Sequence, residues 1–149
     1  MHNRPEARTA ATLIAVLVFA AVLNSAAQDT TFNTLAKGAM SNIEEPRQVV
    51  VRTAAEWQAL WKQHDGNSGA PPVDFMQSIV AAVFLGSRPT TGYAADITGV
   101  RTESGRTIVE YLERQPPRDA FVAQVLTSPF HIVRIARTEG PVEFRRLNK

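Results

Sequence analysis

One stretch of the chain is apolar at every position: Ile79-Val80-Ala81-Ala82-Val83-Phe84-Leu85. A strand with one face in water alternates apolar and polar residues, so an unbroken apolar run predicts a central strand that is covered on both faces. A buried helix is the competing interpretation. The run is short and is followed by Gly86 and Pro89, and both features favour the strand.

A helix with one apolar face is predicted upstream of this strand. Thr53-Ala54-Ala55-Glu56 has the spacing of a capping box, in which the first and last side chains each bond to the other's backbone amide. The apolar face follows at helical spacing and consists of Trp57, Leu60, Trp61 and His64. Residues 65–69 end the helix and a Pro-Pro pair follows. We expect both tryptophans to pack in the core rather than form a ligand cage.

Further strands are expected on both sides of the apolar run. They are residues 48–52, 93–100, 107–114, 130–137 and 142–147, with 121–126 as a short edge segment. Short turns at 103–106 and 138–140 indicate antiparallel pairing, the latter between the last two strands. The expected fold class is therefore α+β, with one antiparallel sheet of about 5–6 strands and the Trp-bearing helix packed on it.

Residues 1–27 have the pattern of a signal peptide. Two arginines precede residues 10–23, which are apolar apart from one threonine. That run is shorter than the roughly 20 residues that a membrane span needs. Small residues follow it, and we expect cleavage after Ala27. The protein is then exported to the periplasm or the extracellular space without a remaining membrane span; an uncleaved anchor is the alternative.

Composition limits what the rest of the chain can be. The chain has 149 residues, a formal charge of +2 and no cysteine. We expect residues 28–37, which are mostly small and polar, to be flexible and residues 38–149 to form a single domain. The missing cysteines exclude disulfides, thiolate metal sites and a cysteine nucleophile. The nearly balanced charge argues against a nucleic-acid-binding protein.

Catalytic and cofactor motifs are absent from the sequence. His64 and His131 stand in no metal-binding spacing, and neither of the common glycine-rich phosphate loops occurs. Ser128, His131 and Asp96 could supply a hydrolytic triad, but no Gly-x-Ser-x-Gly motif accompanies them. We therefore expect no enzyme, no metal and no cofactor.

The most unusual stretch joins two predicted strands and reads Gly86-Ser87-Arg88-Pro89-Thr90-Thr91-Gly92-Tyr93. Proline fixes one torsion angle and glycine permits a positive φ, so the loop can be preorganised for protein recognition. A well-made turn anchored by its tyrosine explains the same residues. The candidate partner-binding residues are Arg88, Pro89, Thr90, Thr91, Gly92 and Tyr93, with His131 and Arg134 as secondary candidates. Arg134 could instead form an ion pair with Asp96.

Four segments resemble the C-terminal domain of PrcB-type protease-complex subunits. They are Val83–Tyr93, Thr127–Arg134, the Glu56-Trp57…Leu60-Trp61…His64 pattern and Pro72–Phe75, and the resemblance covers most of residues 38–144. The family more usually has a second glycine where Thr91 stands. The resemblance implies a non-catalytic exported module that associates with a protease or another envelope protein and supports its assembly or stability.

A second resemblance concerns residues 89–93 alone. Pro-Thr-Thr-Gly-Tyr is similar to the loop with which chagasin-type inhibitors enter the cleft of papain-like cysteine proteases. The other two loop signatures of those inhibitors are missing from the chain, and its predicted helix does not suit an all-β sandwich. An inhibitor of papain-like proteases is the alternative function.

Overall fold

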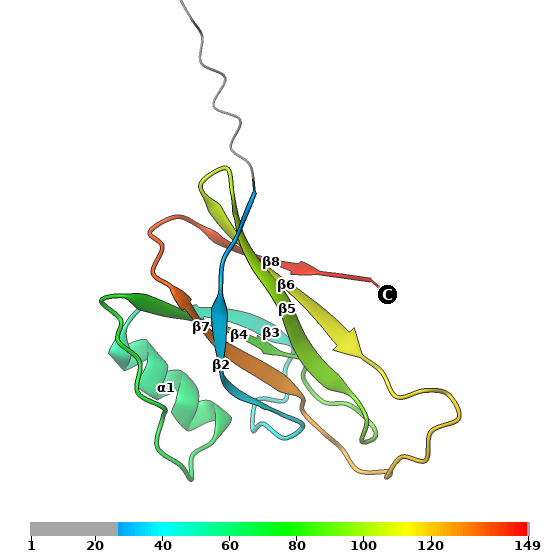
Figure 1. Ribbon diagram of the computed structural model, residues 1–149. Helices are drawn as coiled ribbons and strands as arrows, with labels where there is room; N and C mark the ends of the chain where they lie inside the picture. The colour runs from blue at the N-terminus through cyan, green and yellow to red at the C-terminus, as the bar shows by residue number, and fades with distance from the viewer. Residues whose placement is uncertain (1–26, 149) are drawn as a thin grey trace, which may run out of the picture.

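The computed structural model describes residues 27–148, which form two four-stranded sheets and one helix (Figure 1). The first sheet has the strand order β1-β5-β6-β8 and the second has the order β2-β7-β4-β3. The elements are β1 (Gln28–Asp29), β2 (Phe32–Gly38), β3 (Arg47–Val51), α1 (Ala54–His64), β4 (Ser78–Phe84), β5 (Ala94–Glu103), β6 (Arg106–Arg114), β7 (Phe130–Ala136) and β8 (Val142–Arg146).

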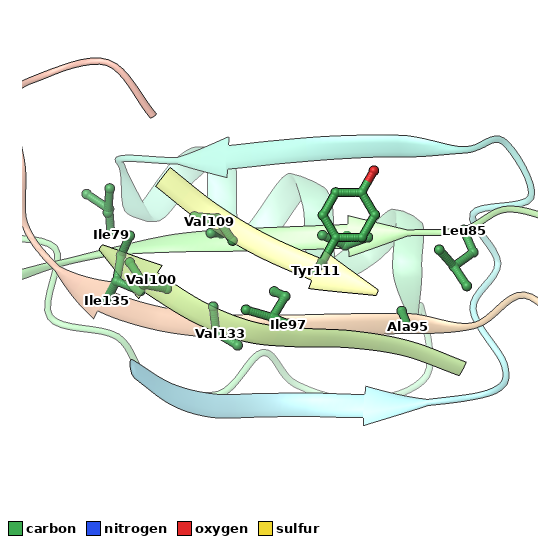
Figure 2. Close-up of a cluster of buried hydrophobic side chains, with 11 residues drawn as sticks. Ile79, Leu85, Ala95, Ile97, Val100, Val109, Tyr111, Val133 and Ile135 are labelled. Atoms are coloured by element: carbon green, nitrogen blue, oxygen red, sulfur yellow. The ribbon is translucent and has the colours of Figure 1, made fainter. Parts of the chain in front are cut away.

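Strand β4 is central and covered on both faces, as its apolar sequence predicts. Alternate residues of a strand point to opposite faces. Ile79, Ala81 and Val83 belong to a core between the two sheets, together with residues of β5, β6 and β7 (Figure 2). Val80 and Ala82 belong to a second core under α1. The molecule therefore has three layers, with the β2-β7-β4-β3 sheet in the middle.

The helix is confirmed with its cap. The Thr53 side chain accepts from the Glu56 amide, and the Glu56 carboxylate accepts from the Thr53 amide. The Trp57 and Trp61 rings meet edge to face with their centroids 5.2 Å apart. Both indole N–H groups donate to carbonyls of the segment that follows the helix, at Pro71 and Ser68. The tryptophans therefore belong to the core. This helix is too short and too polar to cross a membrane, and residues 27–148 contain no other.

The prediction of a single sheet was wrong, because the last strand leaves the sheet of its predecessor. β8 pairs in parallel with β6 rather than back onto β7. Arg52 donates to the carbonyls of Thr138 and Gly140 and holds the turn after β7. Gly140 also packs against the backbone of Gly105 in the β5–β6 turn, where a side chain would collide. These contacts carry the chain from one sheet to the other.

Two further expectations about strands were also wrong. Residues 28–37 are not loose: β1 pairs with β5, and β2 pairs with β7. Their polar composition reflects edge strands that are held mainly by backbone hydrogen bonds. Residues 121–126 form no strand, and the nearby ladder is a single bridge between Arg88 and Thr127. The predicted signal peptide lies outside the described residues apart from Ala27.

Candidate functional site

The candidate loop, residues 86–93, connects β4 to β5 and contains two glycines with positive φ. Gly86 has a φ of 76° and Gly92 a φ of 92°. A Cβ atom on Gly92 would stand 2.7 Å from Cβ of Pro116 and 3.5 Å from Cγ1 of Val122. Glycine is required there by its torsion angle and by the close approach of a second loop, residues 115–127. We call residues 86–93 and 115–127 together the paired loops.

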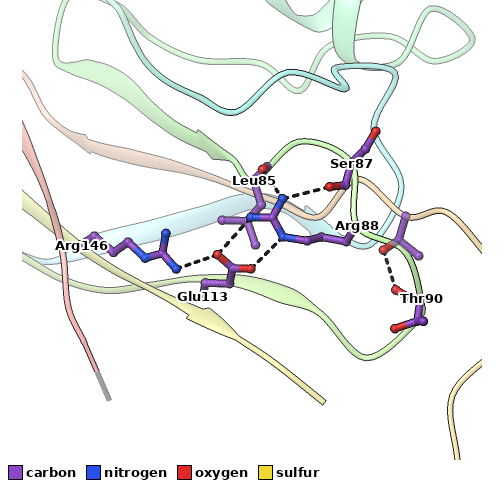
Figure 3. Close-up of polar contacts among 7 residues, drawn as sticks. Leu85, Ser87, Arg88, Thr90, Glu113 and Arg146 are labelled. Carbon is purple, nitrogen blue, oxygen red and sulfur yellow. Dashed lines mark hydrogen bonds and ion pairs between the residues drawn. The ribbon is translucent and has the colours of Figure 1, made fainter.

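Arg88 anchors the first of these loops to the β5-β6-β8 side of the molecule. Its guanidinium donates to both carboxylate oxygens of Glu113, at 2.7 and 3.0 Å, and to the carbonyls of Leu85 and Ser87 (Figure 3). Arg146 donates to the same carboxylate at 2.8 Å. The hydrogen bonds from Arg88 hold the pKa of the Glu113 carboxyl below its usual value. Arg88 therefore acts first as a structural anchor of the loop.

The two threonines fasten the paired loops to each other. The Thr91 amide donates to the Ala123 carbonyl at 3.1 Å, and the Ala123 amide donates back to Thr91 Oγ1 at 3.0 Å. The Thr127 hydroxyl donates to the Thr90 carbonyl at 2.9 Å. Pro89 is exposed and Tyr93 is half-buried. The loop is thus both a well-made turn and a support for residues 115–127.

Three large apolar side chains project from the second loop into solvent. Phe121 is fully exposed, and Val125 and Leu126 are 54% and 69% exposed. Sequence reasoning missed them because it assigned residues 121–126 to an edge strand. The available signal was three large apolar residues in a segment that follows Pro116-Pro117. Exposed apolar groups on a hydrogen-bonded loop are typical of protein-recognition surfaces.

His131 is a core residue, so its assignment to a contact surface was wrong. Its side chain points into the layer between the two sheets and only 3% of the residue is exposed. Nδ1 accepts from the Ile97 amide at 2.8 Å, which leaves the ring proton on Nε2, 2.8 Å from Thr34 Oγ1. Burial lowers the pKa of His131 to about 4; Lys37 adds to this shift and Asp96 opposes it.

The hydrolytic triad does not assemble. Both ring nitrogens of His131 are bonded to Thr34 and Ile97, and the Asp96 carboxylate binds Lys37 and Arg114. Within residues 27–148 no group of three or more acidic or histidine side chains could hold a metal ion.

Arg134 lies apart from the paired loops. The loop leaves the sheet where Phe84 pairs with Phe130, and Arg134 stands four residues further along β7, about 13 Å away. It lines a separate hollow that includes Asn33 and Asp74. The ion pair with Asp96 that the sequence suggested does not form, because Asp96 binds other cations. The structure therefore does not unite Arg134 with the candidate loop.

Comparison with known families gives a match that covers part of the chain. Residues 79–136, from β4 through the paired loops to the end of β7, match the family model described as PrcB C-terminal. The resemblance to the PrcB C-terminal family is confirmed. The match includes the candidate loop, the exposed apolar residues and His131. Comparisons with curated proteins and with solved structures found no match to the chain.

Proposed function

We propose that this protein is an exported, non-catalytic accessory subunit of an extracytoplasmic protease complex. The match to the PrcB C-terminal family supports a role within a protease complex. The signal-peptide pattern of residues 1–27 supports export, and it rests on sequence alone.

One observation carries the proposed binding role: Phe121, Val125 and Leu126 stand exposed on a loop whose backbone is fixed by Thr90 and Thr91. Apolar groups on a preorganised loop lose little conformational entropy when a partner covers them. They are also too exposed to contribute to the fold of the isolated chain. We therefore place the protease contact on the second of the paired loops, with Arg88 to Tyr93 as its support.

The test is capture of the partner from envelope and secreted fractions, with protein from Gln28 onward as bait. Phe121→Ser with Leu126→Ser should leave the melting temperature nearly unchanged and abolish capture of a protease. Met40→Ser with Met76→Ser is the matched control, because Met40 and Met76 are 66% and 85% exposed and lie outside the paired loops. The control should capture the same protease as the unchanged protein.

Three results would count against the proposal. Equal capture by the loop variant and the unchanged protein would contradict the assignment of the protease contact to Phe121 and Leu126. Absence of any captured protease would contradict the proposal that the protein is an accessory subunit of a protease complex. Capture of a papain-like protease whose activity falls in proportion to added protein would favour the inhibitor instead.

A further inference from the structure

A cavity of about 600 Å³ opens where strands β6 and β8 end. Residues 112–115 and 146–148 line it, and Glu113 is the one acidic residue among them. The cavity adjoins the paired loops, because Glu113 binds Arg88 and the next residue after Gln115 is Pro116, which packs on Gly92. It belongs to the same end of the molecule as the proposed contact.

Glu113 is one negative charge that holds two guanidinium groups. Arg88 occupies both of its carboxylate oxygens, and the Glu113 side chain is only 5% exposed. Arg146 reaches the same carboxylate through a single nitrogen, and its side chain is 52% exposed. Since Arg88 already compensates the carboxylate, the charge of Arg146 is surplus and faces the cavity.

Asp96 repeats this arrangement on the neighbouring strand. Its carboxylate binds Lys37 at 2.8 Å and Arg114 at 2.5 Å. The Arg114 side chain lines the cavity and is 51% exposed. Two carboxylates therefore hold four cations, and two of those cations are half-exposed arginines at one cavity. Such an excess attracts an anionic group, and a guanidinium with free N–H donors binds a carboxylate well.

We propose that this cavity receives a glutamate or aspartate side chain of the partner protein that covers the paired loops. The inference rests on the proposed function and adds the chemistry of the partner. Leu112 and Leu147 also line the cavity, so apolar atoms beside the carboxylate would find contacts there. A partner seated on Phe121 and Leu126 brings such a side chain within reach, whereas a free anion would gain only the charge interaction.

The test is a titration followed by amide NMR shifts of the protein from Gln28 onward, which contains every strand described. The probe is acetyl-Leu-Glu-Leu-amide, and its matched control is acetyl-Leu-Gln-Leu-amide. The glutamate peptide should produce saturable shifts at residues 112–115 and 146–148. The glutamine peptide should bind about tenfold more weakly, and added salt should weaken the glutamate peptide alone.

Two matched double variants show whether the glutamate peptide binds at the cavity. Arg114→Ala with Arg146→Ala should abolish the shifts. Arg106→Ala with Arg145→Ala removes the same charge from the same two strands, but these arginines pair with Glu143 and Glu110 and do not line the cavity. That control should bind the glutamate peptide as the unchanged protein does.

Four outcomes of the titration would overturn the inference. They are no saturable shift, equal binding of both peptides, equal loss in both double variants, and tighter binding of inorganic phosphate than of the glutamate peptide. A protease captured by the Arg114/Arg146 variant but lost from the Phe121/Leu126 variant would remove this inference and leave the proposed function standing.

Discussion

The two layers on either side of the central sheet are built from different side chains. The core under α1 contains four buried aromatic residues, Trp57, Trp61, Phe84 and Phe130. The His64 ring lies 4.1 Å from that of Phe130 and 5.1 Å from that of Trp61, centroid to centroid. Between the sheets the buried core residues are aliphatic except Tyr111 (Figure 2), and the partly buried Phe32 and Phe144 pack against them. Each aromatic ring buries a large area under the helix, whereas the inward-facing side chains of two packed sheets interdigitate.

Each layer also contains one buried histidine, and the two are held differently. In the helix layer, His64 Nδ1 lies 2.8 Å from the Ser41 hydroxyl. In the sheet layer, both ring nitrogens of His131 are bonded, and they join backbone of β5 to a side chain of β2. The helix layer therefore depends on ring packing, and the sheet layer also depends on one polar bridge. The following substitutions test this difference.

The largest effect is expected from Trp57→Ala in the helix layer. Trp57 is 2% exposed, and its loss leaves a cavity and an unbonded Pro71 carbonyl. We expect the free energy of unfolding to fall by about 3–5 kcal/mol, measured by urea denaturation. Val133→Ala, its counterpart in the sheet layer, should cost less. An equal loss at both positions would contradict the assignment of the helix layer to large aromatic contacts.

His131→Ala should rank next, with a loss of about 2–4 kcal/mol. The substitution removes the acceptor of the buried Ile97 amide, and a buried donor without a partner is costly. His64→Ala removes a hydrogen bond to the Ser41 hydroxyl and should lower the free energy of unfolding by less through hydrogen bonding. Amide hydrogen exchange distinguishes the two variants. The Ile97 amide should exchange faster in the His131 variant and stay protected in the His64 variant. Protection of Ile97 in both would show that the bridge is unimportant.

Acid should weaken the sheet layer through the same residue. The pKa of His131 is about 4 in the folded protein against 6.5 for the ordinary side chain, so the unfolded chain binds the extra proton between these values. Stability is therefore full above pH 6.5 and falls by about 3 kcal/mol as the pH drops to 4. His131→Gln should flatten the pH dependence of the unfolding free energy in that window. An unchanged slope in this variant would assign the effect to other groups.

Thr53→Ala should give the smallest effect. It removes the hydroxyl that accepts from the Glu56 amide, at a cost of about 1 kcal/mol. Thr53→Ser, which keeps the hydroxyl, is the control and should retain most of the stability. The melting temperature by circular dichroism is sufficient to measure both. A loss above that of His131→Ala would reverse the expected order of these two substitutions.

Local signals in the sequence predicted local structure well. The capping box and the spacing of Trp57 and Trp61 specify α1, and the unbroken apolar run specifies a strand covered on both faces. The number of sheets was not predictable in the same way. It depends on the contact of Gly140 with Gly105 and on the reach of Arg52 to the β7–β8 turn, and both join residues far apart in the sequence.

The candidate site was predictable in part for similar reasons. Pro89 and Gly92 mark a shaped loop from sequence alone. The contacts of that loop are with Val122 and Ala123, thirty or more residues away, and no local pattern shows this pairing. His131 and Arg134 fall on opposite faces of β7 by their spacing, but which face is buried against the other sheet depends on tertiary packing.

The pairing of β2 with β7 affects how the chain folds. Phe32, near the beginning of the described residues, pairs in register with Ile135, more than one hundred residues later in the sequence. The middle layer cannot close until the chain has been synthesised through β7, and contacts so distant in sequence slow folding. Until then the apolar side chains of β4 lack part of their cover on both faces, and apolar surface exposed during folding favours aggregation.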